Sequence, residues 1–373
     1  MIDAMVKELR LNYTNWNELH EFKDEDKTRY SGGGKGNYTN WKELHEFKDE
    51  AETIYFGGGT PSLLTTEEIK LLLDTARNGY RISENAEITL EANPDDISLL
   101  KLKEWKTGGI NRLSIGVQSF HEEDLQWMNR AHNAQQGKES ILLAKEASFD
   151  NYSIDLIFGT PTLTDELWKE NIQQAIDIGV PHISSYALTV EPKTPLSKMI
   201  ALKKVENTDS DKQARQFMIL MDMLIAAGYE HYEISNFAKP GYRSRHNSSY
   251  WQGKDYLGIG PSAHSYGNGK RRWNISNNSI YIQSIQKGTI PFEEEILTPT
   301  QMLNEHIMIS LRTIEGIDLS EVEKRFGRPA MLKIYDASKK YIEPSKMKFE
   351  NNRLTLTNEG KLFADGIAAD MFE

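Results

Sequence analysis

The chain has 373 residues, of which 38% are hydrophobic and 27% charged, and its formal net charge is −11. This acidic balance argues against a surface for nucleic acid or anionic membranes, because such partners need clustered Lys and Arg. Cysteine is absent, which excludes disulfides, thiolate nucleophiles and cysteine ligands to iron. The amino terminus has no apolar run typical of a signal peptide, so we expect a cytoplasmic protein that meets membranes at most through a partner.

The first part of the chain contains an internal repeat. Residues 12–36 closely match residues 37–61, and both copies begin with NYTNW. Two copies are too few for a solenoid, so a tandem duplication is the simpler interpretation. We expect the second copy to occupy the native position and the first to be looped out, with 27–31 available as a substitute strand.

From residue 53 onward, short β-branched runs alternate with helical patterns, which predicts βα units and a parallel sheet. The expected strands are 53–56, 87–91, 112–117, 153–158 and 182–188. The expected helices are 66–79, 99–106, 122–128, 137–147, 165–178 and 211–227.

The pattern changes after the last of these helices. Residues 232–273 are rich in Gly, Ser, Asn and His, which predicts turns. The last part of the chain is predicted to form a winged-helix-like end domain. Its expected elements are helices at 300–312, 319–326 and 331–342, strands at 347–350 and 353–357, and a final helix. Residues 311–373 carry equal numbers of basic and acidic side chains, so packing or a lid role is favoured over DNA binding. The expected domains are 1–36, 37–230, 231–295 and 296–373.

Polar or Gly-rich residues follow the expected strands. Each is a weak signal alone, because a Gly triplet is most often a turn and an Asp after a strand is most often a helix cap. Together they indicate a rim at the carboxyl ends of parallel strands, where ligands bind in such folds. A Gly-rich turn, two acids and an amide suit a ligand with an amine, a carboxylate and a ribose.

An ordered series of motifs carries a family resemblance. The strings are IYFGGGTPSLL, TLEANPDD, INRLSIGVQSF, LQWMNRAHN, SIDLIFGTP, SSYALTVEP, YEISNFAKPG, RHNSSYW and GIGPSAHSY. From about residue 37 to the end, the chain resembles the heme chaperone (HemW-type) branch of the oxygen-independent coproporphyrinogen III oxidase family of radical S-adenosylmethionine proteins. The resemblance implies an α/β fold, a partial (β/α)6 barrel with a small winged-helix-like C-terminal domain.

By matching position, the resemblance implies a binding site for S-adenosylmethionine. The implied contacts to the methionine amino group are Gly58, Gly59 and Thr60. The implied polar contacts to nucleoside and methionine are Glu91, Gln118, Arg130 and Asp155, with a backbone contact at Ala187. These roles are chemically reasonable, since Gly lets backbone approach an ammonium and carboxylates accept from ribose hydroxyls.

One feature of the family is missing from this sequence. Family members hold a [4Fe-4S] cluster with a Cys-x3-Cys-x2-Cys loop that follows the first barrel strand, and this chain has no cysteine. We expect the first strand and the cluster loop to be absent, no metal site or catalytic residue to remain, and radical chemistry to be lost.

The motif from His246 to Trp251 (HNSSYW) resembles the heme-binding motif of this branch. His246 is therefore a candidate axial ligand, with Tyr250 and Trp251 as flat neighbours of the porphyrin. Protonation near pH 6.5 would compete with iron. His264 is the alternative ligand, and a purely structural role for the motif stays open.

Three functions follow from the resemblance. The first is a heme-trafficking protein whose partners are heme or a porphyrin and an acceptor protein that the sequence does not identify. The second is an oxygen-independent coproporphyrinogen III oxidase of porphyrin biosynthesis, against which the missing cluster argues. The third is a degenerate, non-catalytic relative.

Overall fold

The computed structural model describes residues 1–21 and 50–373, with side chains described for 1–13 and 50–373. The chain divides into two compact units. Unit 1 comprises Met1–Thr53, Thr65–Ala86 and Gly253–Met302, and unit 2 comprises Ile54–Leu64, Glu87–Gln252 and Leu303–Glu373. Most of the duplicated segment, including the expected substitute strand at 27–31, lies outside the described residues.

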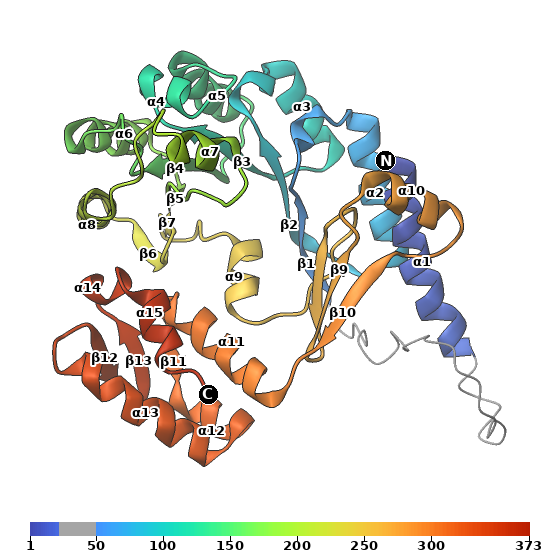
Figure 1. Ribbon diagram of the computed structural model, residues 1–373. Helices are drawn as coiled ribbons and strands as arrows, with labels where there is room; N and C mark the ends of the chain where they lie inside the picture. The colour runs from blue at the N-terminus through green and yellow to red at the C-terminus, as the bar shows by residue number, and fades with distance from the viewer. Residues whose placement is uncertain (22–49) are drawn as a thin grey trace. The chain divides into compact units, whose positions relative to one another are not determined.

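A seven-stranded sheet lies largely within unit 2 and has the order β1-β2-β3-β4-β5-β7-β6 (Figure 1). Its strands are β1 (Ala51–Phe56), β2 (Ile82–Ala92), β3 (Arg112–Gln118), β4 (Tyr152–Phe158), β5 (His182–Ala187), β6 (Glu230–Glu233) and β7 (Asn236–Ala238). Strands β2 to β5 pair in parallel, whereas β7 pairs antiparallel with both β5 and β6. The predicted parallel sheet is confirmed, and β2 begins five residues before the predicted start at 87.

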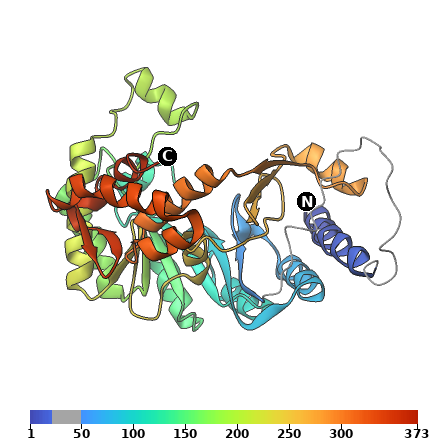
Figure 2. The same ribbon diagram turned by 90° about the horizontal axis from the view of Figure 1, so that it is seen from below.

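Helices follow the strands. They are α2 (Thr66–Gly79), α3 (Leu99–Gly108), α4 (Glu122–Trp127), α5 (Ala134–Glu146), α6 (Asp165–Ile178), α7 (Pro195–Ala201) and α8 (Ser210–Ala226), with short 3-10 turns at Pro61–Leu63 and Pro94–Asp96. Helix α7 was not predicted from the sequence, and α5 begins three residues before the predicted start at 137. Helix α5 begins with a capping box in which Asn133 and Gln136 satisfy each other's backbone N–H groups. Figure 2 shows α7 standing clear of its neighbours, and none of its residues is buried.

The two faces of the sheet differ because alternate residues of a strand point to opposite sides. One face is apolar and packs against helices: Phe158 contacts the rings of Trp168 on α6 and Phe217 on α8. Leu90 and Ile154 lie on this face and are fully buried. The opposite face is polar and carries the candidate site.

The stretch 232–273 contains more regular structure than its composition predicts. Besides the ends of β6 and the short β7, it holds α9 (Arg245–Trp251), β8 (His264–Gly267) and most of β9 (Lys270–Asn274). Small polar residues serve here as helix caps rather than only as turns. The Ser244 side chain, for example, accepts a hydrogen bond from the Asn247 N–H at the start of α9.

In unit 1, helix α1 (Ile2–Glu21) is attached through a buried carboxylate. Glu8 accepts hydrogen bonds from the Gly260 N–H, the Asn274 amide and the Tyr281 hydroxyl, at 2.8, 2.6 and 2.6 Å. Tyr281 belongs to α10 (Asn278–Gln286), and Asn274 ends β9 in a three-stranded sheet ordered β10-β9-β8, in which β10 is Phe292–Ile296. Burial raises the pKa of Glu8.

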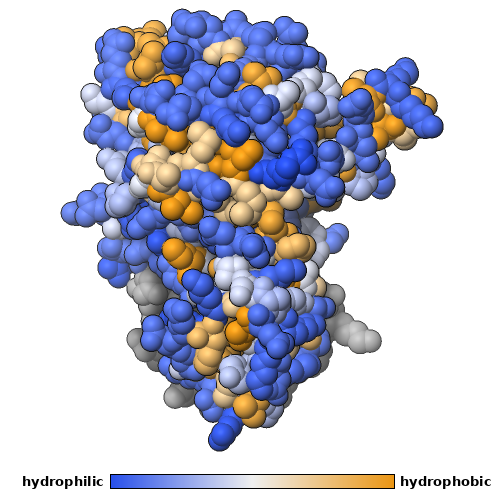
Figure 3. All heavy atoms as spheres, turned by 90° about the vertical axis from the view of Figure 1, so that its left-hand side faces the viewer, coloured by the Kyte–Doolittle hydropathy of each residue, from blue (hydrophilic) through white to orange (hydrophobic). Residues whose placement is uncertain are grey.

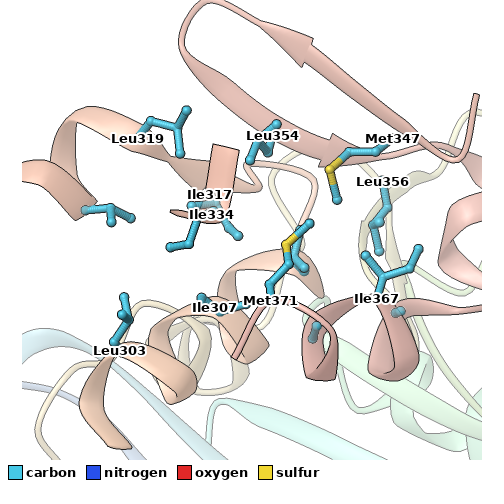
Figure 4. Packing of buried hydrophobic residues seen from close by; sticks show 14 of the residues in the cluster. Leu303, Ile307, Ile317, Leu319, Ile334, Met347, Leu354, Leu356, Ile367 and Met371 are labelled. Atoms are coloured by element: carbon cyan, nitrogen blue, oxygen red, sulfur yellow. The ribbon is translucent and has the colours of Figure 1, made fainter. Parts of the chain in front are cut away.

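The C-terminal part of unit 2 has its own core. Its elements are α11 (Pro299–Leu311), β11 (Ile317–Asp318), α12 (Leu319–Phe326), α13 (Arg328–Ile342), β12 (Met347–Glu350), β13 (Arg353–Leu356), α14 (Asn358–Lys361) and α15 (Ala364–Ala369). The strands form a sheet ordered β11-β13-β12. The buried side chains of this core come from its three strands and from α11, α12, α13 and α15, and Figure 4 shows Ile307, Ile334, Leu354 and Ile367 among them. The predicted helices and hairpin are present, and α13 starts three residues before the predicted start at 331.

On the face drawn in Figure 3, hydrophilic side chains are interspersed with separate apolar patches. Among the described residues, no helix has both the length and the apolar character that crossing a bilayer requires.

Candidate functional site

The polar face of the sheet forms a layer of charged and hydroxyl side chains. In the strand register, Glu91 is paired with Ser114, Ser114 with Ser153, and Asp155 with Ser184. Further members of the same face, by alternation along their strands, are Glu87, Thr89, Arg112, His182 and Tyr186. The predicted residues Glu91 and Asp155 therefore face the same side of the sheet.

The Gly-rich turn after β1 packs against Glu91. The Gly58 N–H donates to one carboxylate oxygen of Glu91 at 3.1 Å, and the Tyr55 hydroxyl donates to the other at 2.8 Å. Gly58 and Gly59 have φ angles of 74° and 64°, a region that favours glycine. Gly58 and Gly59 are exposed, and Thr60 precedes the short 3-10 turn at Pro61–Leu63. The structure thus brings the predicted turn and Glu91 together.

Gln118 and Arg130 meet above a glycine of β3. A Cβ on Gly116 would lie 2.9 Å from the Gln118 side-chain nitrogen and 3.5 Å from an Arg130 guanidinium nitrogen. Arg130 donates to the Asn93 side chain at 3.1 Å, and its Nε is buried without a hydrogen-bond partner. Gln118 adopts a φ of 67° where the β3–β4 register shifts. A guanidinium whose Nε has no hydrogen-bond partner suits a carboxylate ligand at this edge.

Asp155 lies in the middle of the polar face. Burial and the neighbouring charge of Glu91 raise its pKa to about 7, while Arg112 and Arg130 act in the opposite direction. Ala187 ends β5 in register with Phe158 and is exposed, as is its neighbour Tyr186. All eight residues implied for S-adenosylmethionine lie in unit 2.

Helix α9 is anchored to strand β2 by a buried acid. The carboxylate of Glu87 accepts hydrogen bonds from the N–H groups of Arg245 and His246, at 3.1 and 3.0 Å, and from the Ser244 hydroxyl at 3.4 Å. Arg112 lies 3.9 Å from the same carboxylate. The HNSSYW motif is therefore attached to the polar face of the sheet.

His246 lies between two tyrosines. Its ring stacks on Tyr55 with centroids 4.6 Å apart, and Tyr250 meets it edge-on. The His246 Nε2 atom is 3.1 Å from the Tyr250 hydroxyl. Burial, reinforced by Arg112 and opposed by Glu87, lowers the pKa of His246 to about 4. The expectation of protonation near pH 6.5 is wrong for this environment, because burial disfavours the charged imidazolium.

The other two candidate heme residues differ from His246 in their surroundings. Trp251 lies under the guanidinium of Arg312, 5.2 Å from the ring centroid, and its indole N–H is buried without a hydrogen-bond partner. Arg312 also pairs with Glu233 at 3.0 Å. His264 begins β8 in unit 1 and is exposed. The structure therefore places Tyr250 and Trp251 on one helix with His246 in unit 2, whereas His264 belongs to a strand of unit 1.

Sequence reasoning missed four residues of the polar face: Tyr55, Glu87, Arg112 and His182. The His182 Nε2 atom lies 2.7 Å from the Tyr232 hydroxyl, and burial holds the pKa of this histidine well below its usual range. Alternation of polar and apolar residues within the predicted strands could have identified Glu87, Arg112 and His182. Tyr55 carried no such signal, because its partner His246 is distant in sequence.

The residues present do not fit an iron–sulfur cluster. The chain has no cysteine, and in the ranges 1–21 and 50–373 no group of three or more His, Asp or Glu side chains is arranged to hold a metal ion.

Two family models match this chain. Residues 41–175 match the radical SAM superfamily, and residues 297–363 match the HemN C-terminal domain. Among solved structures, coproporphyrinogen III oxidase (HemN) from Escherichia coli superposes with a TM-score of 0.73 over 86% of this chain and 77% of that one, at 21% identity. The sheet and its helices thus define a half-barrel of the radical SAM type with a HemN-like C-terminal domain.

Several relatives with similar sequences are heme chaperones, which indicates a particular branch of the radical SAM proteins. Heme chaperone HemW from Bacillus subtilis is 33% identical over 82% of this chain and 81% of its own length. HemW from Lactococcus lactis is 31% identical over 80% and 78%, and HemW from Escherichia coli is 40% identical over 54% and 52%. The chain belongs to the HemW-type branch of the radical SAM proteins.

Proposed function

We propose that this protein binds heme on helix α9, with His246 as the axial ligand, and acts as a heme chaperone-like protein. The observation that carries the proposal is the state of His246. Its imidazole is neutral at physiological pH and is held between Tyr55 and Tyr250 at a fixed place on the sheet. A neutral imidazole is the form that binds iron. The names of the HemW relatives support heme as the cargo, and an acceptor protein would be the second partner.

The rim of the sheet is the proposed site for S-adenosylmethionine. The methionine amino group would bind at the turn formed by Gly58, Gly59 and Thr60. The carboxylates of Glu91 and Asp155 would accept hydrogen bonds from the ribose hydroxyls or the amine. Gln118, Arg130 and the Ala187 backbone would complete the contacts. The family resemblance implies a [4Fe-4S] cluster as the source of the electron that would cleave the sulfonium. This chain has no cysteine to hold that cluster, so the proposal includes no radical step.

Two other functions are less well supported. Coproporphyrinogen oxidation rests on a structural likeness at 21% identity, which concerns the fold alone. A non-catalytic relative that binds S-adenosylmethionine without chemistry is favoured by the absence of cysteine.

A heme titration tests the proposal. The purified chain is titrated with hemin and with ferrous heme, and the Soret band is followed. We expect a saturable spectrum that His246→Ala abolishes or strongly shifts, whereas His264→Ala and the matched control His121→Ala leave it unchanged. Loss of the spectrum in His264→Ala alone would move the ligand to His264. If neither candidate variant altered the spectrum, the non-catalytic relative would become the preferred function.

A further inference from the structure

Strand β2 contacts both proposed binding regions. Glu87 and Glu91 are four residues apart and so face the same side of the strand. Glu87 accepts the backbone N–H of His246, whereas Glu91 accepts the N–H of Gly58 in the glycine turn. The two regions are therefore attached to the part of one strand, β2, that lies in unit 2.

Tyr55 provides a second, more direct connection. Its hydroxyl donates to Glu91 at 2.8 Å, while its ring stacks on the imidazole of His246 with an interplanar angle of 14°. Desolvation and the charge of Glu91 raise the pKa of Tyr55, so the hydroxyl keeps its proton and remains a donor. One side chain thus contacts the carboxylate at the rim and the imidazole of the heme motif.

We infer that Tyr55 is a positioning residue that couples the hydrogen-bonding state of Glu91 to the orientation of His246, and thereby to heme ligation. The inference rests on the proposed function, because it takes His246 as the heme ligand. A ligand hydroxyl that donates to Glu91 competes with the Tyr55 hydroxyl for the same carboxylate. When Tyr55 loses that bond, its ring is no longer held against the imidazole, so occupancy of the rim changes how His246 presents its nitrogen to iron.

A double-mutant cycle on the full chain tests this coupling. Heme dissociation constants and Soret maxima are measured for wild type, Tyr55→Phe, Glu91→Gln and the double variant. Tyr55→Phe keeps an aromatic ring at this position and removes only the hydroxyl, and with it the bond to Glu91 that holds the ring in place. We expect each single variant to change the heme dissociation constant about two- to tenfold, the range for one net hydrogen bond, and the double variant to match a single one.

Two further variants separate coupling from general destabilisation. Tyr229→Phe removes a buried tyrosine hydroxyl that donates to the Val180 carbonyl, and it should combine additively with Glu91→Gln. Tyr55→Leu removes the ring and should shift the Soret maximum further than Tyr55→Phe. Circular dichroism confirms that each variant is folded, and Tyr55→Phe is conservative enough to keep the cycle measurable.

The outcomes distinguish the two claims. The coupling would be overturned if Tyr55→Phe and Glu91→Gln changed the heme dissociation constant additively, or if neither changed it. This holds even if His246→Ala abolishes the Soret band. An unchanged spectrum in His246→Ala would overturn the ligation itself, and the coupling with it.

Discussion

The imidazole of His246 is stacked on the ring of Tyr55, with centroids 4.6 Å apart and planes inclined by 14°. The stack joins helix α9 to strand β1, two elements separated by most of the half-barrel sequence. We take Nε2 of His246 as the nitrogen that would bind iron. This atom also lies at hydrogen-bond distance from the Tyr250 hydroxyl, so it already has a partner within the protein. Heme must compete with that partner.

This competition predicts that Tyr250→Phe binds heme more tightly. The substitution keeps the aromatic face and removes the hydroxyl, so ligation no longer requires that hydrogen bond to break. The dissociation constant should fall about two- to fivefold, in line with the net value of one hydrogen bond. Soret titration measures it. Weaker binding would instead assign the Tyr250 hydroxyl to the heme site itself.

Heme binding should be insensitive to pH between about 7.5 and 5. The folded protein holds the pKa of His246 at about 4, so the imidazole is already neutral across this range and no proton has to leave before iron binds. Heme dissociation constants at three pH values test this, with circular dichroism as the folding control. A break near 6.5 would mean that His246 is solvated or is not the ligand.

Buried histidines should make the fold sensitive to acid. His231 accepts a hydrogen bond from the Lys361 ammonium at Nδ1, and burial, followed by that charge, lowers its pKa to about 3. The unfolded chain binds a proton near 6.5 that the folded chain does not, so stability is present above 6.5 and is lost as pH falls toward 3. Burial lowers the pKa of Lys361 to about 8, so its contribution is lost as pH falls from about 10.5 to about 8, above the range in which His231 acts.

A matched variant isolates His231. Gln in its place stays neutral and can still donate and accept, so His231→Gln should lack this titration. Relative to that variant, the unfolding free energy of the wild type should fall by up to about 1.4 kcal/mol per pH unit below 6.5. Urea unfolding at about pH 7.5, 6.5 and 5.5 measures the difference. A difference independent of pH would show that His231 titrates normally.

Two neighbouring glycines should respond differently to alanine. A Cβ on Gly57 would lie 2.6 Å from the ring of Tyr55, so Gly57→Ala should displace Tyr55 and shift the heme spectrum. Gly58 has open space around it but a φ of 74°, so Gly58→Ala should cost about 1 kcal/mol of stability without altering the spectrum. Thermal melts and Soret spectra of the pair test this. Identical spectra in both would argue that the turn does not control Tyr55.

Reconstitution with iron and sulfide should leave the chain without a cluster. No thiolate is available, and the described residues offer no alternative group of metal ligands. Anaerobic reconstitution followed by iron analysis and an assay for 5′-deoxyadenosine checks this. A stoichiometric brown chromophore with S-adenosylmethionine cleavage would contradict it.

The parallel sheet and its helices could be predicted from the sequence because their signals are local. Short β-branched runs and amphipathic periods report on each element alone. The capping box of Asn133 and Gln136 was overlooked, so the predicted start of α5 at 137 lay three residues too late. The stretch 232–273 was harder to predict, since Ser and Asn favour both turns and helix caps. Its helix α9 is short and is anchored by Glu87, which is more than 150 residues away.

The sequence by itself determined the family and the absence of cysteine ligands, because motif order and composition need no coordinates. Only the tertiary structure decided which residues share the site. Tyr55, Glu87 and His246 come from three separate segments, and their contacts depend on how β1, β2 and α9 pack. The neutral state of His246 was decided in the same way, since its low pKa comes from burial and from Arg112, and neither can be inferred from neighbours in the chain.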